Sequence, residues 1–84
     1  MAVTDNSALS RFELPVNGQT AVLTYERRPG VMKMIHTEVP EPFRGRGYGE
    51  MLVKAAIAQA RAEGLTVVAV CPFVRAYLRT HPPA

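Results

Sequence analysis

The sequence has few of the residues that stabilise small secreted or metal-binding domains. Its 84 residues include one cysteine, Cys71, and no tryptophan. A single cysteine excludes an internal disulfide framework and a multi-cysteine zinc site, the usual stabilising devices at this size. We therefore expect a reducing compartment, with the cytoplasm as the default location.

Long apolar runs are also missing. No stretch approaches the roughly 20 consecutive apolar residues that cross a bilayer, and residues 1–6 lack the basic and apolar regions of a signal peptide. We therefore expect no membrane association. Hydrophobic residues make up 48% of the chain and charged residues 20%, which is typical of a folded globule and excludes a disordered polyelectrolyte.

The length suffices for one hydrophobic core and not for two. We expect residues 1–84 to form a single domain in which residues 1–8 are flexible. The net charge of +3 is compatible with an anionic ligand or with nucleic acid. Eight of the ten basic residues are arginine, which favours forked recognition of phosphate or carboxylate.

Alternating apolar residues predict three strands in the first half of the chain. Residues 11–16 alternate, and Asn17-Gly18 follows with the strongest short-range signal for a hairpin turn. A second strand is expected from Gln19 to about Glu26 and a third from Val31 to about Val39, where two prolines follow. Together they form an antiparallel meander.

The second half predicts a helix, a strand and a second helix. Alanine, leucine, methionine and lysine dominate residues 48–63, which favours a helix that stops at Gly64. Residues 65–70 form an apolar run typical of a strand buried on both faces, expected to lie parallel to the third strand. A short helix is expected over about residues 72–80.

The segment Arg-Gly-Arg-Gly-Tyr-Gly, residues 44–49, lies between a predicted strand and a predicted helix. Its glycines let several N–H groups point into one concavity, and the helix start adds partial positive charge, so an anionic phosphate is the natural occupant. Arg44 and Arg46 can add side-chain contacts. The alternative is a glycine-rich helix entry with two solvated arginines. The segment matches neither a Walker A loop nor the dinucleotide G-x-G-x-x-G.

Two other positions carry groups that can do chemistry. His36 and Glu38 share one face of the third strand near its end, where either can take up a proton; the alternative is an ordinary polar strand end. Cys71 precedes the last helix, whose N-terminus favours the thiolate; the alternative is an inert buried thiol. His-x-Glu is no zinc deaminase site, because the cysteine pair of that site is missing, and we expect no metal.

Four short motifs follow one another along residues 10–83: His36-Thr37-Glu38-Val39, the 44–49 loop, Cys71-Pro72-Phe73-Val74 and Arg79-Thr80-His81-Pro82. With these motifs the chain resembles the acetyl-coenzyme A-dependent N-acetyltransferases of the GNAT superfamily, and more narrowly their very short single-domain members. The resemblance implies a minimal α+β fold whose sheet splays after the third strand, where coenzyme A inserts its pantetheine. It also implies that the helices which normally build the acceptor site are missing.

The resemblance implies a site as well. Cys71 is the expected proton donor or transient acyl acceptor, with His36 as the base; a structural role for Cys71 is the alternative. The expected cofactor-binding residues are Glu38, Val39, Arg44, Gly45, Arg46, Gly47, Tyr48, Gly49, Phe73 and Tyr77.

The sequence therefore predicts an enzyme that transfers an acetyl group from acetyl-coenzyme A to a small or flexible amine. The alternative is a non-catalytic module that binds coenzyme A or acyl-CoA. Nucleic-acid binding ranks below both, because the arginines scatter from Arg11 to Arg79 without an aromatic stacking pattern. We expect a monomer or a weak homodimer, since Ile57 falls on the charged face of the predicted helix.

Overall fold

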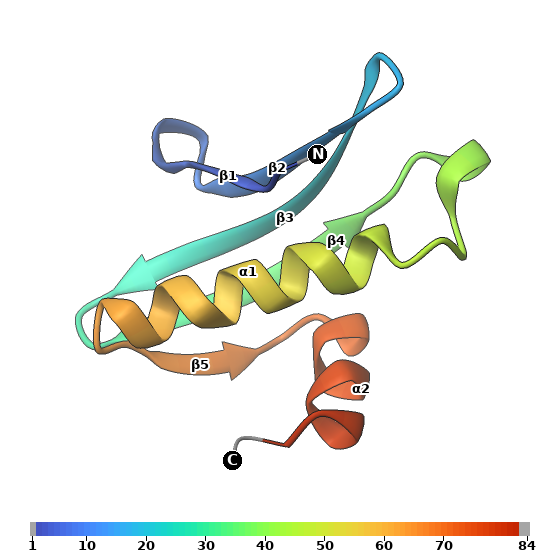
Figure 1. The fold of residues 1–84 in the computed structure, drawn as a ribbon. Helices are drawn as coiled ribbons and strands as arrows, with labels where there is room; N and C mark the ends of the chain where they lie inside the picture. The colour runs from blue at the N-terminus through green and yellow to red at the C-terminus, as the bar shows by residue number, and fades with distance from the viewer. Residues whose placement is uncertain (1, 83–84) are drawn as a thin grey trace.

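A five-stranded sheet forms the centre of the computed structural model, which describes residues 2–82 (Figure 1). Helix α1 crosses one face of this sheet, and α2 packs beside it against β4 and β5. The strands are β1 (Thr4–Asn6), β2 (Arg11–Val16), β3 (Gln19–Arg28), β4 (Val31–Glu38) and β5 (Thr66–Ala69); the helices are α1 (Tyr48–Ala62) and α2 (Pro72–Thr80), with short 3₁₀ turns η1 (Ser7–Leu9) and η2 (Glu41–Phe43).

The strand order in the sheet is the order in the chain, β1-β2-β3-β4-β5. The first four strands pair antiparallel, each with the next strand in sequence, and β5 pairs parallel to β4. This arrangement confirms the predicted meander, the helix that leads to a parallel strand, and the short C-terminal helix. The Asn17-Gly18 turn has the positive φ angles that its hairpin requires, 45° and 81°.

The hydrophobic core lies between the sheet and α1. Alternate residues of β2, β3 and β4 point to this side, and α1 meets them with a stripe of apolar residues three and four positions apart. Burying this stripe explains why a helix follows the meander. The largest fully buried side chains are Leu14, Val16, Leu23, Met32, Met34, Leu52, Val53 and Val74.

Two details of α1 differ from the prediction. Ile57, expected on the charged face, is 8% exposed, because Tyr77 and Leu78 of α2 lie beside it and a helix wheel does not include that second neighbour. Met51 and Ala62 also differ: a count of apolar positions places them with the inward-facing residues, but both are exposed, because they lie together on the side of α1 opposite its buried stripe. Glu50, Lys54 and Arg61, the charged residues of α1, face solvent.

The expectation that the 65–70 strand is buried on both faces is wrong. β5 is an edge strand whose residues alternate between exposed and partly buried. Val68 is 37% exposed and Val70 is 47% exposed. The helices cover only one side of β5, so its apolar side chains on the other side stay partly exposed.

The segment expected to be flexible, residues 1–8, instead forms β1 and part of η1, while Met1 lies outside the described residues. A polar cluster holds β1 in place. The Tyr25 hydroxyl donates to Asp5 Oδ1 at 2.5 Å, and Arg27 donates to Asp5 Oδ2 at 2.9 Å. Arg27 also donates to Glu63, just after α1, at 2.8 Å. The three residues of β1 are too few to show an alternating pattern in the sequence. Long-range hydrogen bonds hold this strand in the sheet.

The Asp5–Tyr25 bond predicts an alkaline transition. Burial, followed by the hydrogen bond and charge of Asp5, raises the pKa of Tyr25 to about 12, with Arg27 opposing the shift. A phenol whose pKa is higher in the folded state stabilises the fold below its ordinary value of 10.0, and this contribution is lost as the pH rises from there towards 12. Phenolate absorbance should therefore show one tyrosine titrating last, and Asp5→Asn should lower its pKa.

Glu26→Gln is the matched control, because Glu26 is a carboxylate that bonds Arg28 rather than Tyr25. It should leave the late tyrosine unchanged. Three tyrosines titrating together in the wild-type chain would contradict the cluster.

Candidate functional site

An extra residue in β4 decides which side chains face the helices. Tyr25 of β3 pairs with Met34, but Thr24 pairs with His36, so Ile35 has no partner and bulges. Before the bulge, Met34 points into the core; after it, Thr37 and Val39 point to the same side. His36 and Glu38 consequently lie on the opposite face of the sheet. Extrapolating the alternation of β4 without the bulge would reverse this assignment.

The sheet opens just beyond the bulge. The amides of Val70 and Cys71 both donate to the carbonyl oxygen of Met34, at 3.0 and 2.9 Å, and β4–β5 pairing ends there. β4 continues to Glu38, while the chain after β5 turns into α2. The end of β4 is thus separated from β5 by the start of α2, which is consistent with the splay that the family resemblance implies.

The glycine loop borders this opening. Gly45 and Gly47 have φ angles of 78° and 84°, which side-chain-bearing residues rarely adopt. Gly47 is the N-cap of α1, so no side chain caps the amides of the first helical turn. Arg44 Nε donates to the carbonyl oxygen of Val39 at 3.0 Å, which ties the loop to the end of β4.

A pocket of about 370 Å³ lies between the end of β4, the glycine loop and the first turn of α2. Its wall combines loop backbone, one arginine, one carboxylate and three aromatic rings. The lining residues are Thr37, Val39, Phe43, Arg44, Gly45, Gly47, Tyr48, Gly49, Glu50 and Phe73. The pocket therefore offers uncapped amides and a cation at one end and apolar surface along its sides.

Helix α1 and α2 meet at this pocket through Gly49 and Phe73. A Cβ atom on Gly49 would lie 2.9 Å from Cζ of Phe73, closer than real side chains approach. The absence of a side chain at Gly49 therefore allows the ring to lie against the helix. Phe73 itself is 43% exposed, so one side of the ring remains available to the pocket.

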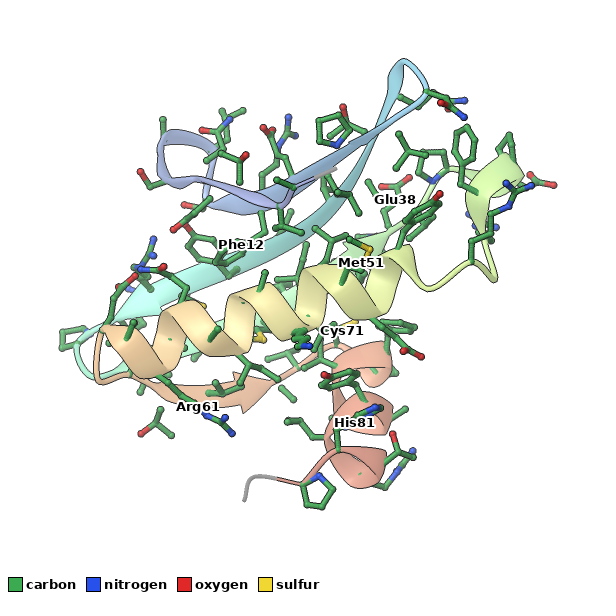
Figure 2. The ribbon with its side chains drawn as sticks, in the orientation of Figure 1. Phe12, Glu38, Met51, Arg61, Cys71 and His81 are labelled. Carbon is green, nitrogen blue, oxygen red and sulfur yellow. The ribbon has the colours of Figure 1, made fainter. Side chains whose placement is uncertain are left out.

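Cys71 is the N-cap residue of α2 and lies at the edge of the opening (Figure 2). Its side chain is 4% exposed, and Sγ is 3.7 Å from Oγ1 of Thr37. Burial alone would raise the pKa of this thiol, but hydrogen bonds from the Val74 and Phe73 amides and from Thr37 outweigh burial and lower the pKa. A thiol held this way can exchange a proton or act as a nucleophile.

Most of the sequence-predicted cofactor residues line one pocket, and three do not. Val39, Arg44, Gly45, Gly47, Tyr48, Gly49 and Phe73 belong to it. Glu38 lies on the opposite face of the sheet, and Arg46 is exposed outside the lining. Tyr77 lies in a neighbouring groove, stacked on His81 at 4.1 Å between ring centroids.

Three lining residues, Thr37, Phe43 and Glu50, are not among the residues that the sequence motifs predict for the site. Phe43 and Glu50 directly flank the glycine loop in the sequence, and this adjacency could have predicted that they line the same pocket. Thr37 lies between His36 and Glu38, and its position in the pocket follows from the bulge alone.

His36 and Cys71 do not face each other. The His36 side chain is 64% exposed, and its Nε2 lies 3.9 Å from Oε2 of Glu38 on the open side of the sheet. Its sequence neighbour Thr37 contacts Cys71 from the other side. The two candidate groups thus border the opening from opposite faces of β4.

No three histidine, cysteine, aspartate or glutamate side chains gather as a metal site within residues 2–82. In the same part of the chain, no helix combines the length and the apolar character needed to cross a membrane.

Comparison with known proteins agrees with this geometry. Residues 11–84 match the sequence profile of the GCN5-related N-acetyl-transferase family. The chain belongs to this family of N-acetyltransferases. It is also 35% identical over 75 residues to Protein NATD1 of Mus musculus, which covers 86% of this chain and 68% of that protein. Protein NATD1 of Xenopus tropicalis is 36% identical, with 86% and 69% covered.

In this GCN5-related N-acetyltransferase domain, the contact between Gly49 and Phe73 predicts that substitutions at the two positions have coupled effects on stability. Gly49→Ala gains at most the roughly 0.5–1 kcal/mol that alanine gains over glycine in the middle of a helix, because Gly49 lies in the first turn of α1. The new methyl group also displaces the Phe73 ring, so the thermal stability should change little or fall. In a Phe73→Ala background the collision is removed, and the same substitution should stabilise the fold. Thermal unfolding of both single variants and the double variant measures the coupling.

Gly64→Ala is the control for this cycle. Gly64 has a φ angle of 72° and no atom near its added Cβ, so strain should destabilise it equally in both backgrounds. An equal effect of Gly49→Ala with and without Phe73 would contradict the contact.

The Cys71 environment predicts a pH dependence. Ultraviolet thiolate absorbance, taken as wild type minus Cys71→Ala, should inflect below the ordinary value of 9.0. Because the pKa is lower in the folded state, the thiolate stabilises the fold above that value, and this contribution is lost as the pH falls through the lowered pKa. Thr37→Val should raise the inflection by removing a hydrogen bond to sulfur.

Thr24→Val serves as the control, since the Thr24 hydroxyl donates to the carbonyl of His36 and makes no contact with Cys71. An inflection at or above the ordinary value in the wild-type protein would contradict the hydrogen-bonded thiolate.

Proposed function

We propose that this protein binds acetyl-coenzyme A in the pocket at the end of β4 and transfers the acetyl group to a small or flexible amine. The observation that carries the proposal is the pocket itself. Its uncapped helix amides and Arg44 lie at one end, and it extends to Thr37, which contacts Cys71. Family membership supports the same reaction class.

The residues present fit the chemistry of the cofactor. A pyrophosphate needs several N–H donors and a cation, which the first turn of α1 and Arg44 provide. A pantetheine arm carries amide groups and needs a strand edge, and β4 beyond Met34 has an edge that β5 does not pair. Phe43, Tyr48 and Phe73 supply apolar surface between these ends.

When bound, acetyl-coenzyme A supplies a thioester carbonyl that an amine can attack. His36, on the open face, accepts the proton that the amine loses as the carbon–nitrogen bond forms. Cys71, on the helix face, donates a proton to the departing sulfur as the carbon–sulfur bond breaks, and its lowered pKa makes it a stronger acid for this donation.

The proposal is tested first by binding. Calorimetric titration with coenzyme A should show saturable binding that weakens by about tenfold or more in Arg44→Ala, the usual effect of losing a charged hydrogen bond. Arg75→Ala is the control, because this exposed arginine of α2 lies outside the pocket lining. No binding of coenzyme A by the wild-type protein would overturn the proposal.

Transfer is then measured as thiol release from acetyl-coenzyme A in the presence of small amines and flexible peptides. A His36→Ala/Cys71→Ala variant that still binds coenzyme A should lose turnover. Mass spectrometry of the wild-type protein with acetyl-coenzyme A distinguishes the two roles of Cys71: a transient acyl acceptor gains the mass of an acetyl group, and a proton donor does not. Binding without turnover for any amine would favour the alternative, a non-catalytic acyl-CoA-binding module.

A further inference from the structure

Cys71 lies close to the pocket but does not border it. The residue is 4% exposed, and the lining of the pocket includes Thr37 and Phe73 but not Cys71. A side chain donates a proton to a reacting group only from within hydrogen-bond reach or through one intervening group. The proton that Cys71 supplies in the proposed reaction therefore needs a path from the buried sulfur to the pocket.

Thr37 lies on that path. Its Oγ1 atom is 3.7 Å from Sγ of Cys71, in a contact where either atom can be the donor. The amide of Thr37 faces the same sulfur. Thr37 is also a lining residue of the pocket. Because a hydroxyl accepts one hydrogen bond while it donates another, Thr37 can connect the thiol to a group in the pocket.

The bulge in β4 makes Thr37, and not His36, the neighbour of the thiol. The face of the sheet that α1 and α2 leave bare carries His36, whose side chain is 64% exposed. The extra residue at Ile35 places Thr37 on the other face, with Cys71. A proton that leaves the sulfur towards β4 therefore meets the Thr37 hydroxyl.

The chemistry of the cofactor decides which of its groups comes to Thr37. In coenzyme A the pyrophosphate and the sulfur lie at opposite ends of the pantetheine arm. The proposed partners of the pyrophosphate, Arg44 and the first amides of α1, lie at the glycine-loop end of the pocket. Thr37 lies at the end that adjoins Cys71. A cofactor held by its pyrophosphate at the loop thus directs its sulfur towards Thr37.

We propose that Thr37 is a catalytic residue that relays the proton of Cys71 to the departing sulfur of coenzyme A, an inference that rests on the proposed acetyl transfer. As the carbon–sulfur bond breaks, its electron pair stays on the sulfur, which takes the hydroxyl proton of Thr37. The Thr37 oxygen takes up the thiol proton of Cys71 in the same step. The products are the free thiol of coenzyme A, an unchanged threonine and a Cys71 thiolate, which regains a proton from water. Cys71 is not acylated in this sequence.

The surroundings of Cys71 favour the thiolate that the relay leaves behind. Burial raises the pKa of the thiol, but the amide of Val74, the hydroxyl of Thr37 and the amide of Phe73 together lower it below its ordinary value of 9.0. The two amides belong to the first turn of α2, so they stay beside the sulfur whichever way the hydroxyl points. A threonine hydroxyl alone is a very weak acid, so the relay needs both residues.

Steady-state kinetics of thiol release test this dependence. Thr37→Val keeps the shape of the side chain without its hydroxyl, and should lower kcat about a hundredfold, with little change in KM for acetyl-coenzyme A. Thr37→Ser keeps the hydroxyl and should retain most of the rate. In a Cys71→Ala background the relay is already broken, so Thr37→Val should lower kcat by no more than roughly twofold. Thr66→Val, at an exposed position of β5, is the control and should leave kcat unchanged.

Alkylation by iodoacetamide gives a second readout that needs no cofactor. The chain has one cysteine, so its intact mass reports on Cys71 alone. Alkylation should be slow in the wild-type protein and in Thr37→Val. It should be about tenfold faster or more in Thr37→Ala, because the shortened side chain gives the reagent access to the sulfur from the pocket. Thr66→Ala is the matched control and should react as slowly as the wild-type protein. Circular dichroism establishes that each variant is folded.

Four results would overturn the relay. These are an unchanged kcat in folded Thr37→Val, an equally large loss in the Cys71→Ala background, an acetylated Cys71 in the wild-type protein, and alkylation that is no faster in Thr37→Ala. Failure of the proposed function gives a different result, because the wild-type protein would then release no thiol with any amine. The catalytic role of Thr37 would fail with it, while the alkylation rates would still show whether Thr37 separates the thiol from the pocket.

Discussion

The bulge at Ile35 is the constraint on which the site depends. Because side chains alternate along a strand, one extra residue exchanges the faces of every residue that follows. Here it brings Thr37 and Val39 to the helix side and sends His36 and Glu38 to the bare side. The pocket, the contact between Thr37 and Cys71, and the separation of the two candidate proton-transfer groups all follow from that exchange.

The second requirement is that β5 end early. The amides of Val70 and Cys71 converge on one carbonyl, that of Met34, and this convergence turns the chain out of the sheet. Because β5 ends at Ala69, α2 begins beside the end of β4. The start of α2 therefore places Cys71 and Phe73 at the opening. A short strand and a bulged neighbour thus produce an opening in a sheet of only five strands.

The small size of the chain explains the remaining character of the molecule. One helix layer on one sheet face makes a core, and the polar cluster of Asp5, Tyr25 and Arg27 holds the first strand to it. Because the described chain has only two helices, both on one side, the second face of the sheet has no helix over it. The positive charge of the chain is concentrated on the helix and pocket side, where an anionic cofactor would be attracted.

Much of the fold could be predicted because its signals are local. Alternation, the Asn17-Gly18 turn, the helical composition before Gly64 and the proline that begins α2 each act within a few residues. The glycine loop was recognisable for the same reason: its conformational freedom and its place before a helix are properties of adjacent residues. Errors arose where burial depends on a distant partner, as for Ile57 beneath α2 and for the bare side of β5.

By itself, then, the sequence determined the order of the elements from β2 to α2, the glycine loop before α1 and the set of candidate side chains. Only the tertiary structure decided which of those side chains share a surface. The register shift that moves His36 away from Cys71 arises from pairing between β3 and β4, and Thr37 meets Cys71 across 34 positions of chain. Such contacts depend on how distant segments pack, and no pattern within a single segment records them.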